Sequence, residues 1–241
     1  MKYKILGMLL LLSFNVFAQK NDSSKKTPVE RIPSDWTIAV EIFRGKGSYT
    51  QELREAFTDY FAPIEGAVDV GYKNITLYLR YSLASTHTQK PLTFNNIEWE
   101  DNLHLSVFMH ETALGYQVLN ARMLKLAPFV GFGSHKIQDT GVTSSILNPE
   151  PLDASNTKVQ ALTYSLGLNL DFNFSEFIKE IILAKPHSSD KTDGFFFRTR
   201  YAYNLPQFSK KYEGLDGNFH SLTIGFGISK RINRKAPTFE K

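Results

Sequence analysis

The chain has 241 residues, of which 28 are basic and 24 are acidic, and it contains no cysteine. The lack of cysteine excludes disulfide bonds, thiolate metal sites and thiol nucleophiles. Loss of Lys2 and Lys4 with the signal sequence described next leaves 26 basic residues, so the balance of charge gives no support to nucleic-acid binding.

The first 18 residues have the features of a secretory signal. A basic start precedes an apolar run over residues 5–17, and the small residues Val16 and Ala18 occupy the −3 and −1 positions of a cleavage site. This run is too short for a transmembrane helix, which needs about 20 residues. We therefore predict export of the chain, with cleavage after Ala18.

Residues 19–34 are polar and charged and contain two prolines, which predicts a flexible leader. From residue 36 onward, apolar residues alternate with other residues, which is the pattern of β-strands with two different faces. Eight strands are expected, at residues 36–43, 66–72, 75–85, 103–119, 123–137, 162–174, 194–204 and 219–230.

Two of the connections between these strands predict short helices. Apolar residues recur at helical spacing over residues 49–61, and Ser48 with Gln51 predicts a capping box at the start. Ser175 is the expected N-cap of a second helix, which stops before Pro186.

Pro128 lies inside the fifth expected strand, where it removes a hydrogen-bond donor from the backbone ladder. A proline at such a position predicts a β-bulge, in which one strand carries an extra residue. The ladder around Pro128 is therefore expected to be irregular.

Residues 162–174, LTYSLGLNLDFNF, show the alternation most clearly. One face carries leucine, tyrosine and phenylalanine, and the other carries small or polar residues. A strand in a soluble protein usually has about 5–6 residues, whereas a strand that crosses a bilayer needs about 9–11. A segment of this length with one wholly apolar face favours contact with lipid.

Connections between the expected strands alternate between long and short, except for the connection at residues 174–192, which is longer than the alternation predicts. The pattern is typical of an up-and-down membrane barrel with long outer loops and short periplasmic turns. The predicted fold class is all-β: an eight-stranded antiparallel up-and-down transmembrane β-barrel over residues 35–230, with one or two short helices and a basic tail at 231–241.

The face opposite the apolar residues carries small residues and charges of both signs. In a narrow eight-stranded barrel this face fills the lumen, and groups buried there need partners of opposite charge. We expect a structural ion-pair network that leaves no open pore. Its predicted members are Glu41, Asp69, Arg80, Glu111, Asp171, Arg198 and Arg200.

Two other functions remain open at this point. A soluble lipocalin-like periplasmic carrier would use the same alternation with its apolar face turned inward around an apolar ligand. An outer-membrane lipid-modifying acyltransferase or deacylase would need a histidine base beside a hydroxyl at the outer rim, for which His104 or His220 with Ser106 or Ser221 are the candidates.

No metal or cofactor motif is present in the sequence. It has no His-x-x-x-His pair, no HExxH motif and no glycine-rich phosphate loop before a helix. Residues 196–212 combine basic and aromatic residues, as nucleic-acid patches do, but the alternation places the arginines and most of the tyrosines on opposite faces. We predict neither enzymatic activity nor a nucleic-acid partner.

The segments GYKNITLYLRYSL (71–83) and SLTIGFGISK (221–230), together with the signal sequence, resemble small bacterial outer-membrane β-barrel proteins, of the kind common in Bacteroidota. The resemblance implies an outer-membrane protein that contacts lipid, depends on the barrel assembly machinery and has a structural or surface-interaction role. We expect a monomer whose loops near residues 87–102, 138–157 and 205–218 face outside. Such barrels often end on an aromatic residue, whereas here eleven residues follow the last strand.

Overall fold

The computed structural model describes residues 31–94, 97–121, 123–139, 158–177, 194–212 and 215–235. The expected signal sequence, most of the leader, most of the expected helix before Pro186 and the last residues of the basic tail lie outside this part of the chain. Within it, no helix has the length and the apolar character needed to cross a membrane. Residues Asp35–Ile232 form one compact unit.

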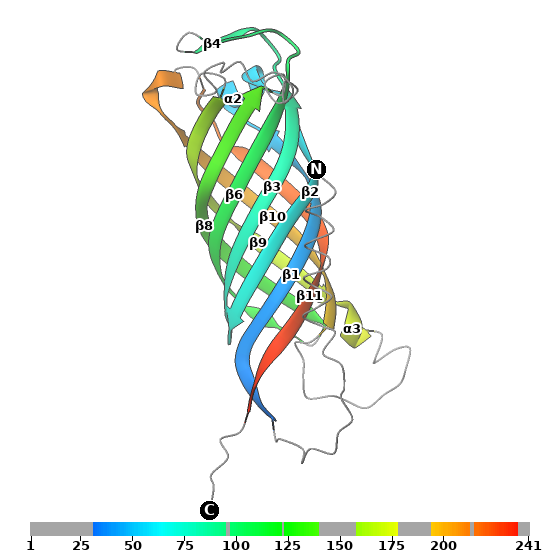
Figure 1. Ribbon diagram of the computed structural model, residues 1–241. Helices are drawn as coiled ribbons and strands as arrows, with labels where there is room; N and C mark the ends of the chain where they lie inside the picture. Colours follow the sequence, from blue (N-terminus) through cyan, green and yellow to red (C-terminus); the bar gives the residue numbers. More distant parts are fainter. Residues whose placement is uncertain are drawn as a thin grey trace, which may run out of the picture. The chain divides into compact units, whose positions relative to one another are not determined.

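Eight long antiparallel strands close into a barrel (Figure 1). Each strand pairs with its neighbours in the chain, and β1 pairs with β11, so the sheet has no free long edge. This confirms the predicted eight-stranded up-and-down barrel. In chain order the strands are β1 (Arg31–Tyr49), β2 (Tyr60–Tyr72), β3 (Ile75–His87), β6 (His104–Tyr116), β8 (Leu124–Asp139), β9 (Lys158–Asn173), β10 (Gly194–Phe208) and β11 (Phe219–Lys235).

The apolar residues of the alternation point outward. Leu166 and Ile224 are 49% and 46% exposed and Phe226 is 72% exposed, whereas Ser165 and Asn169 are buried. A lipocalin-like carrier would instead direct the apolar residues into a cavity, so its arrangement is not the one observed. The outward apolar side chains, called the apolar belt below, include Ile38, Val40, Val68, Leu77, Leu79, Leu114, Val130, Phe132, Leu162, Leu166, Leu168, Leu170, Leu222, Ile224 and Phe226.

The sheet has a bulge at a proline, but this proline is Pro63 on β2 and not Pro128. The register of β2 against β3 shifts between Phe61 and Ile64, and Pro63 has no partner in the ladder on either side. Because β2 continues through this irregularity, it begins at Tyr60, six residues before the predicted start of the strand. Strand pairing with β1 and β3 therefore outweighs the break at the proline.

The bulge predicted at Pro128 was wrong. Pro128 pairs with Leu168 of β9, and the register of that ladder runs on without a shift. The carbonyl of Pro128 lies close to Gly115 of β6. Because the N–H and C=O groups of one strand residue point to the same side, the N–H group that proline lacks would also face β6. The β6–β8 ladder ends one residue away, at Phe129, and the proline interrupts no pairing there.

One end of the barrel, called the cap, carries the connections β1–β2, β3–β6 and β10–β11 (Figure 1). These connections hold α2 (Gln51–Ala56), the hairpin of β4 (Leu92–Phe94) and β5 (Ile97–Trp99), and the 3-10 helix η3 (Lys210–Tyr212). Apolar side chains from the cap and from the adjacent strand ends form one buried cluster. Its members include Tyr49, Leu53, Phe57, Tyr60, Leu92, Trp99, Leu105, Ile137, Val159, Tyr212, Leu215 and Phe219.

The helix predicted over residues 49–61 is limited to α2, since Phe57 is already extended. The predicted capping box was wrong as well: Thr50 is the N-cap and makes no side-chain capping bond, and the Ser48 hydroxyl donates to Asp59 at 2.8 Å. Tertiary packing explains the difference, because the aromatic residues at helical spacing meet in the buried cluster without sharing one helix.

The opposite end of the barrel, called the turn end, carries the tight Lys73–Asn74 turn and the β6–β8 connection with β7 (Leu119–Asn120). The connection after β9 begins there with α3 (Phe174–Phe177). Ser175 lies inside α3, so its predicted role as N-cap was wrong. Its hydroxyl accepts a hydrogen bond from the backbone N–H of Phe195 at 2.7 Å and so ties α3 to the start of β10.

Candidate functional site

The inward face of the barrel is the candidate site, because it collects the charged residues of the strands. Residues two apart share a face, so the alternation that exposes the apolar belt turns these charges inward. Small residues such as Ala39, Ala67 and Ala113 leave room for the long side chains and are themselves buried. All seven predicted network residues point inward. Six of them are hydrogen-bonded within the predicted set, in two separate clusters, and Arg80 pairs with Glu65, which lies outside that set.

Arg198 on β10 is the centre of the first ionic cluster. Its Nε and Nη2 donate to the two carboxylate oxygens of Asp171, at 2.5 and 2.7 Å, in the fork geometry that arginine favours. Its Nη1 donates to Glu41 at 2.5 Å and to Asp69 at 2.6 Å. Strands β1, β2 and β9 thus each contribute a carboxylate to one buried guanidinium group, which also lies over the ring of Tyr78.

Arg200, two residues further along β10, forms the second cluster. It donates to Glu111 of β6 at 2.5 Å and to the side-chain oxygen of Asn169 at 3.1 Å. The second oxygen of Glu111 accepts a hydrogen bond from Ser165 at 2.5 Å. The guanidinium carbon of Arg200 lies 3.5 Å from the centre of the Phe129 ring, so an aromatic face covers the charge on one side.

Arg80 on β3 forms the third cluster, and its partner was not predicted. Its Nη2 donates to Glu65 of β2 at 2.7 Å and to the Thr223 hydroxyl at 3.2 Å. Both charged side chains are buried, at 8% and 7% exposure. Glu65 was missed because the second strand was expected to begin at Gly66. Its position two residues before Ala67 and four before Asp69 is the signal that identifies it.

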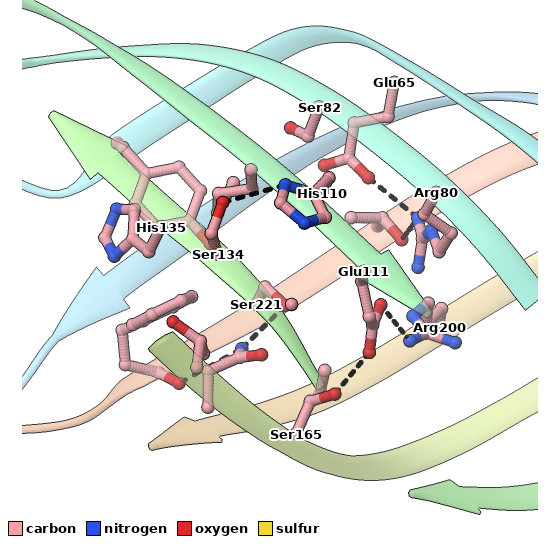
Figure 2. Close-up of a pocket in the computed structure, with 18 residues that line it drawn as sticks. Glu65, Arg80, Ser82, His110, Glu111, Ser134, His135, Ser165, Arg200 and Ser221 are labelled. Atoms are coloured by element: carbon pink, nitrogen blue, oxygen red, sulfur yellow. Dashed lines mark hydrogen bonds and ion pairs between the residues drawn. The ribbon is translucent and has the colours of Figure 1, made fainter. Parts of the chain in front are cut away.

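A cavity of about 60 Å³ lies beside the second and third clusters (Figure 2). Its lining extends to Tyr60 and Phe219 of the buried cluster under the cap. Glu65, Arg80, Glu111 and Arg200 line it together with residues such as Ser82 and His135. A second cavity, of about 50 Å³, lies beside Arg198 and Asp171 and is lined by Lys125 and Thr37 as well. Both are small spaces between paired charges.

Three of the four residues weighed for catalysis, His104, His220 and Ser221, have other contacts. The rings of His104 and His87 lie 4.8 Å apart, and Nδ1 of His220 bonds the Tyr201 hydroxyl at 2.5 Å. Ser221 accepts a long, 3.4 Å hydrogen bond from the side chain of Asn204. Ser106 is half-buried on β6.

A serine–histidine hydrogen bond that was not predicted joins Ser134 of β8 and His110 of β6. The Ser134 hydroxyl lies 2.8 Å from Nδ1 of His110, and the two residues are cross-strand partners in the β6–β8 ladder. Both residues occupy outward positions of their strands, where His110 is exposed and Ser134 is half-buried, and both also border the cavity beside Arg80 and Arg200 (Figure 2).

The basic and aromatic residues of 196–212 do not form a surface patch, because Arg198 and Arg200 are buried in the barrel. Within the described residues, no group of three or more histidine, aspartate or glutamate side chains is arranged to hold a metal ion. The chemistry that the interior supports is charge pairing.

No protein-family model and no curated protein matches this sequence. Among solved structures, the chain is similar to the Neisserial surface protein A, with 9% identity over 82% of this chain and 98% of that one and a TM-score of 0.44. It is also similar to Ail of Yersinia pestis in complex with a heparin analogue, with 9% identity, 83% and 100% coverage and a TM-score of 0.40. A third is the N-terminal β-barrel domain of Pseudomonas aeruginosa OprF, with 15% identity, 83% and 100% coverage and a TM-score of 0.38.

Proposed function

We propose that this chain is an integral outer-membrane β-barrel protein with a structural or surface-interaction role, and that side chains close its lumen. The observation that carries the proposal is the inside-out distribution of residues. The outward faces of all eight strands carry exposed aliphatic and aromatic side chains, whereas the inward faces carry paired charges. Soluble monomers rarely expose apolar patches of more than a few hundred Å².

The closed lumen is supported by what fills the barrel. Eight strands enclose a space just wide enough for side chains. Here three arginine clusters occupy the middle, and the apolar cluster under the cap occupies one end. The cavities described above, at about 60 and 50 Å³, each hold only a few water molecules. The proposed role is therefore that of a membrane-embedded support for the cap, and not that of a pore.

Orientation follows from the lengths of the connections. Outer-membrane barrels have short periplasmic turns and longer outer loops. The Lys73–Asn74 turn then faces the periplasm, and the cap faces outside with the β4–β5 hairpin and the residues near 205–218. Removal of the signal after Ala18, folding by the barrel assembly machinery and a monomeric state complete this proposal.

Expression of the full chain in a Gram-negative host tests the proposal. We expect the protein in the outer-membrane fraction, with a gel mobility that differs before and after boiling. In planar bilayers the purified barrel should give no steady conductance, because ion pairs and the cap fill the lumen. Recovery of the protein in the soluble periplasm would contradict the membrane location, and stable open channels would contradict the closed lumen.

The hydrogen bond between Ser134 and His110 favours a second candidate function, the modification of lipid esters. A hydroxyl bonded to a histidine is the minimum that nucleophilic acyl transfer requires. The pair faces outward beside the apolar belt, where the ester groups of lipids lie. Mass spectrometry of the lipids of cells with the wild-type chain and with Ser134→Ala tests this function, and identical lipid profiles would exclude it.

A further inference from the structure

The outward faces of β8 and β9 change from apolar to cationic near the cap. On β8 the belt ends at Phe132, and on β9 it ends at Leu162. Ser134 follows Phe132 on β8, and the outward positions beyond Ser134 and beyond Leu162 form a group that we call the cationic wall patch. Its members are Lys136, Gln138, Lys158 and Gln160.

The β8–β9 ladder brings the two lysines of the patch together. Lys136 pairs with Gln160, and Gln138 pairs with Lys158, so the lysines are diagonal neighbours on one face. Side chains in this relation are within reach of each other when they are long. The ammonium group of Lys136 also lies 5.4 Å from the centre of the Phe108 ring on β6, which holds it against the wall.

Neither lysine has a carboxylate partner among the described residues, although other lysines near the cap do. Lys46 lies 3.1 Å from Asp59, and Lys90 lies 3.0 Å from Glu55. Two like charges on adjacent strands that form no ion pair within the described part of the chain destabilise each other. An anion placed between Lys136 and Lys158 would remove this repulsion, and the amide groups of the two glutamines could donate hydrogen bonds to it.

The height of the patch along the barrel indicates which anion it meets. It lies directly beyond the apolar belt on the same outward face, and not on the tip of the cap. In a membrane barrel this level is the boundary between acyl chains and headgroups, where basic side chains meet lipid phosphates. A macromolecule that approached from outside would meet the cap first.

We propose that the cationic wall patch binds the phosphate of an anionic lipid in the outer leaflet. This inference rests on the membrane location proposed above. Lys136 and Lys158 supply the charge, and Gln138 and Gln160 supply neutral donors. The acyl chains of the bound lipid then lie along Phe132 and Leu162 of the belt.

Native mass spectrometry of the full barrel, released from bilayers of phosphatidylcholine with phosphatidic acid, tests the patch. The wild-type chain should retain phosphatidic acid in preference to the neutral lipid. Lys136→Gln with Lys158→Gln should reduce that preference roughly thirtyfold, at about a fivefold loss for each lysine. The matched control is Lys90→Gln, which removes an already paired lysine and should leave the preference unchanged.

The gel mobility shift, measured on the same samples, separates the two possible failures. If the variants and the wild-type chain are all folded in bilayers but retain phosphatidic acid equally, the patch proposal is wrong and the membrane barrel stands. If the wild-type chain does not fold in bilayers of either composition, the membrane location itself is wrong. A double variant that does not fold is replaced by Lys136→Arg with Lys158→Arg, which should keep the preference.

Discussion

Replacement of Arg198 by methionine removes the positive charge on which three buried carboxylates depend. In the folded barrel Arg198 makes four hydrogen bonds of 2.5–2.7 Å with Glu41, Asp69 and Asp171. Its side chain is 7% exposed and that of Glu41 is fully buried. Removal of one partner from a buried ion pair lowers the free energy of unfolding by about 3–5 kcal/mol. We expect Arg198→Met to fall in this range.

Urea unfolding of the barrel in phospholipid vesicles, followed by tryptophan fluorescence and by gel mobility, measures this loss. Lys90→Met is the control, because the exposed Lys90–Glu55 pair should contribute less than about 1 kcal/mol. Addition of Glu41→Gln and Asp69→Asn to Arg198→Met should restore part of the stability, since neutral amides leave fewer unpaired charges. If Arg198→Met is no less stable than Lys90→Met, or if the triple variant is no more stable than the single one, the three carboxylates do not depend on Arg198.

Two further predictions concern backbone packing and pH. A Cβ atom on Gly167 would overlap an aromatic ring and the backbone of the next strand, whereas one on Gly66 would meet nothing within 4 Å. Gly167→Val should therefore lower the urea midpoint by the equivalent of about 1–3 kcal/mol, and Gly66→Val should not. Equal midpoints for the two variants would contradict the tight packing at Gly167. Partial burial raises the pKa of Asp59, but hydrogen bonds from Ser48 and Lys46 outweigh it and hold the pKa below the ordinary value of an aspartate. The contacts of Asp59 should therefore persist until the pH falls through that lowered pKa. In Ser48→Ala, the NMR titration of the Asp59 carboxyl should move to higher pH. An unchanged titration would show that the Ser48 hydroxyl does not lower this pKa.

The two faces of the strands could be predicted from the sequence, because period-2 alternation is a local property. Leu166 and Leu168 lie on one face of β9 whatever the strand pairs with, and Asn169 lies on the other. The tight turn at Lys73–Asn74 and the order of the strands follow from local signals as well. The sequence also places Asp171 and Arg198 on inward faces, because each is out of phase with its apolar neighbours.

The partner of each charge could not be predicted, because it depends on register and on closure of the barrel. Glu41 and Arg198 are 157 residues apart and meet only when β11 pairs with both β1 and β10. Glu65 was not predicted, for a different reason. The strand was expected to begin at Gly66, whereas in the barrel β2 continues back through a bulge at Pro63 between two fixed neighbours.

The cap is the part in which local signals mislead most. The aromatic residues Tyr49, Phe57 and Tyr60 are spaced like one helical face, yet only Gln51–Ala56 is helical. Burial under the cap brings these rings together: the centroids of Tyr49 and Tyr60 lie 5.5 Å apart, and those of Tyr49 and Phe57 lie 5.9 Å apart. Tertiary contacts therefore produced a spacing that sequence reasoning attributes to a helix.

The central claim, that the apolar belt contacts acyl chains, is tested most directly by single cysteines, since the chain has none of its own. Leu166→Cys and Gln160→Cys lie on the same face of β9, within the belt and just beyond it. A small fluorophore at residue 166 should be quenched by lipids brominated in the acyl chains and protected from aqueous iodide. At residue 160 iodide should quench more strongly. Iodide quenching at residue 166, or no quenching there by brominated lipid, would contradict the account.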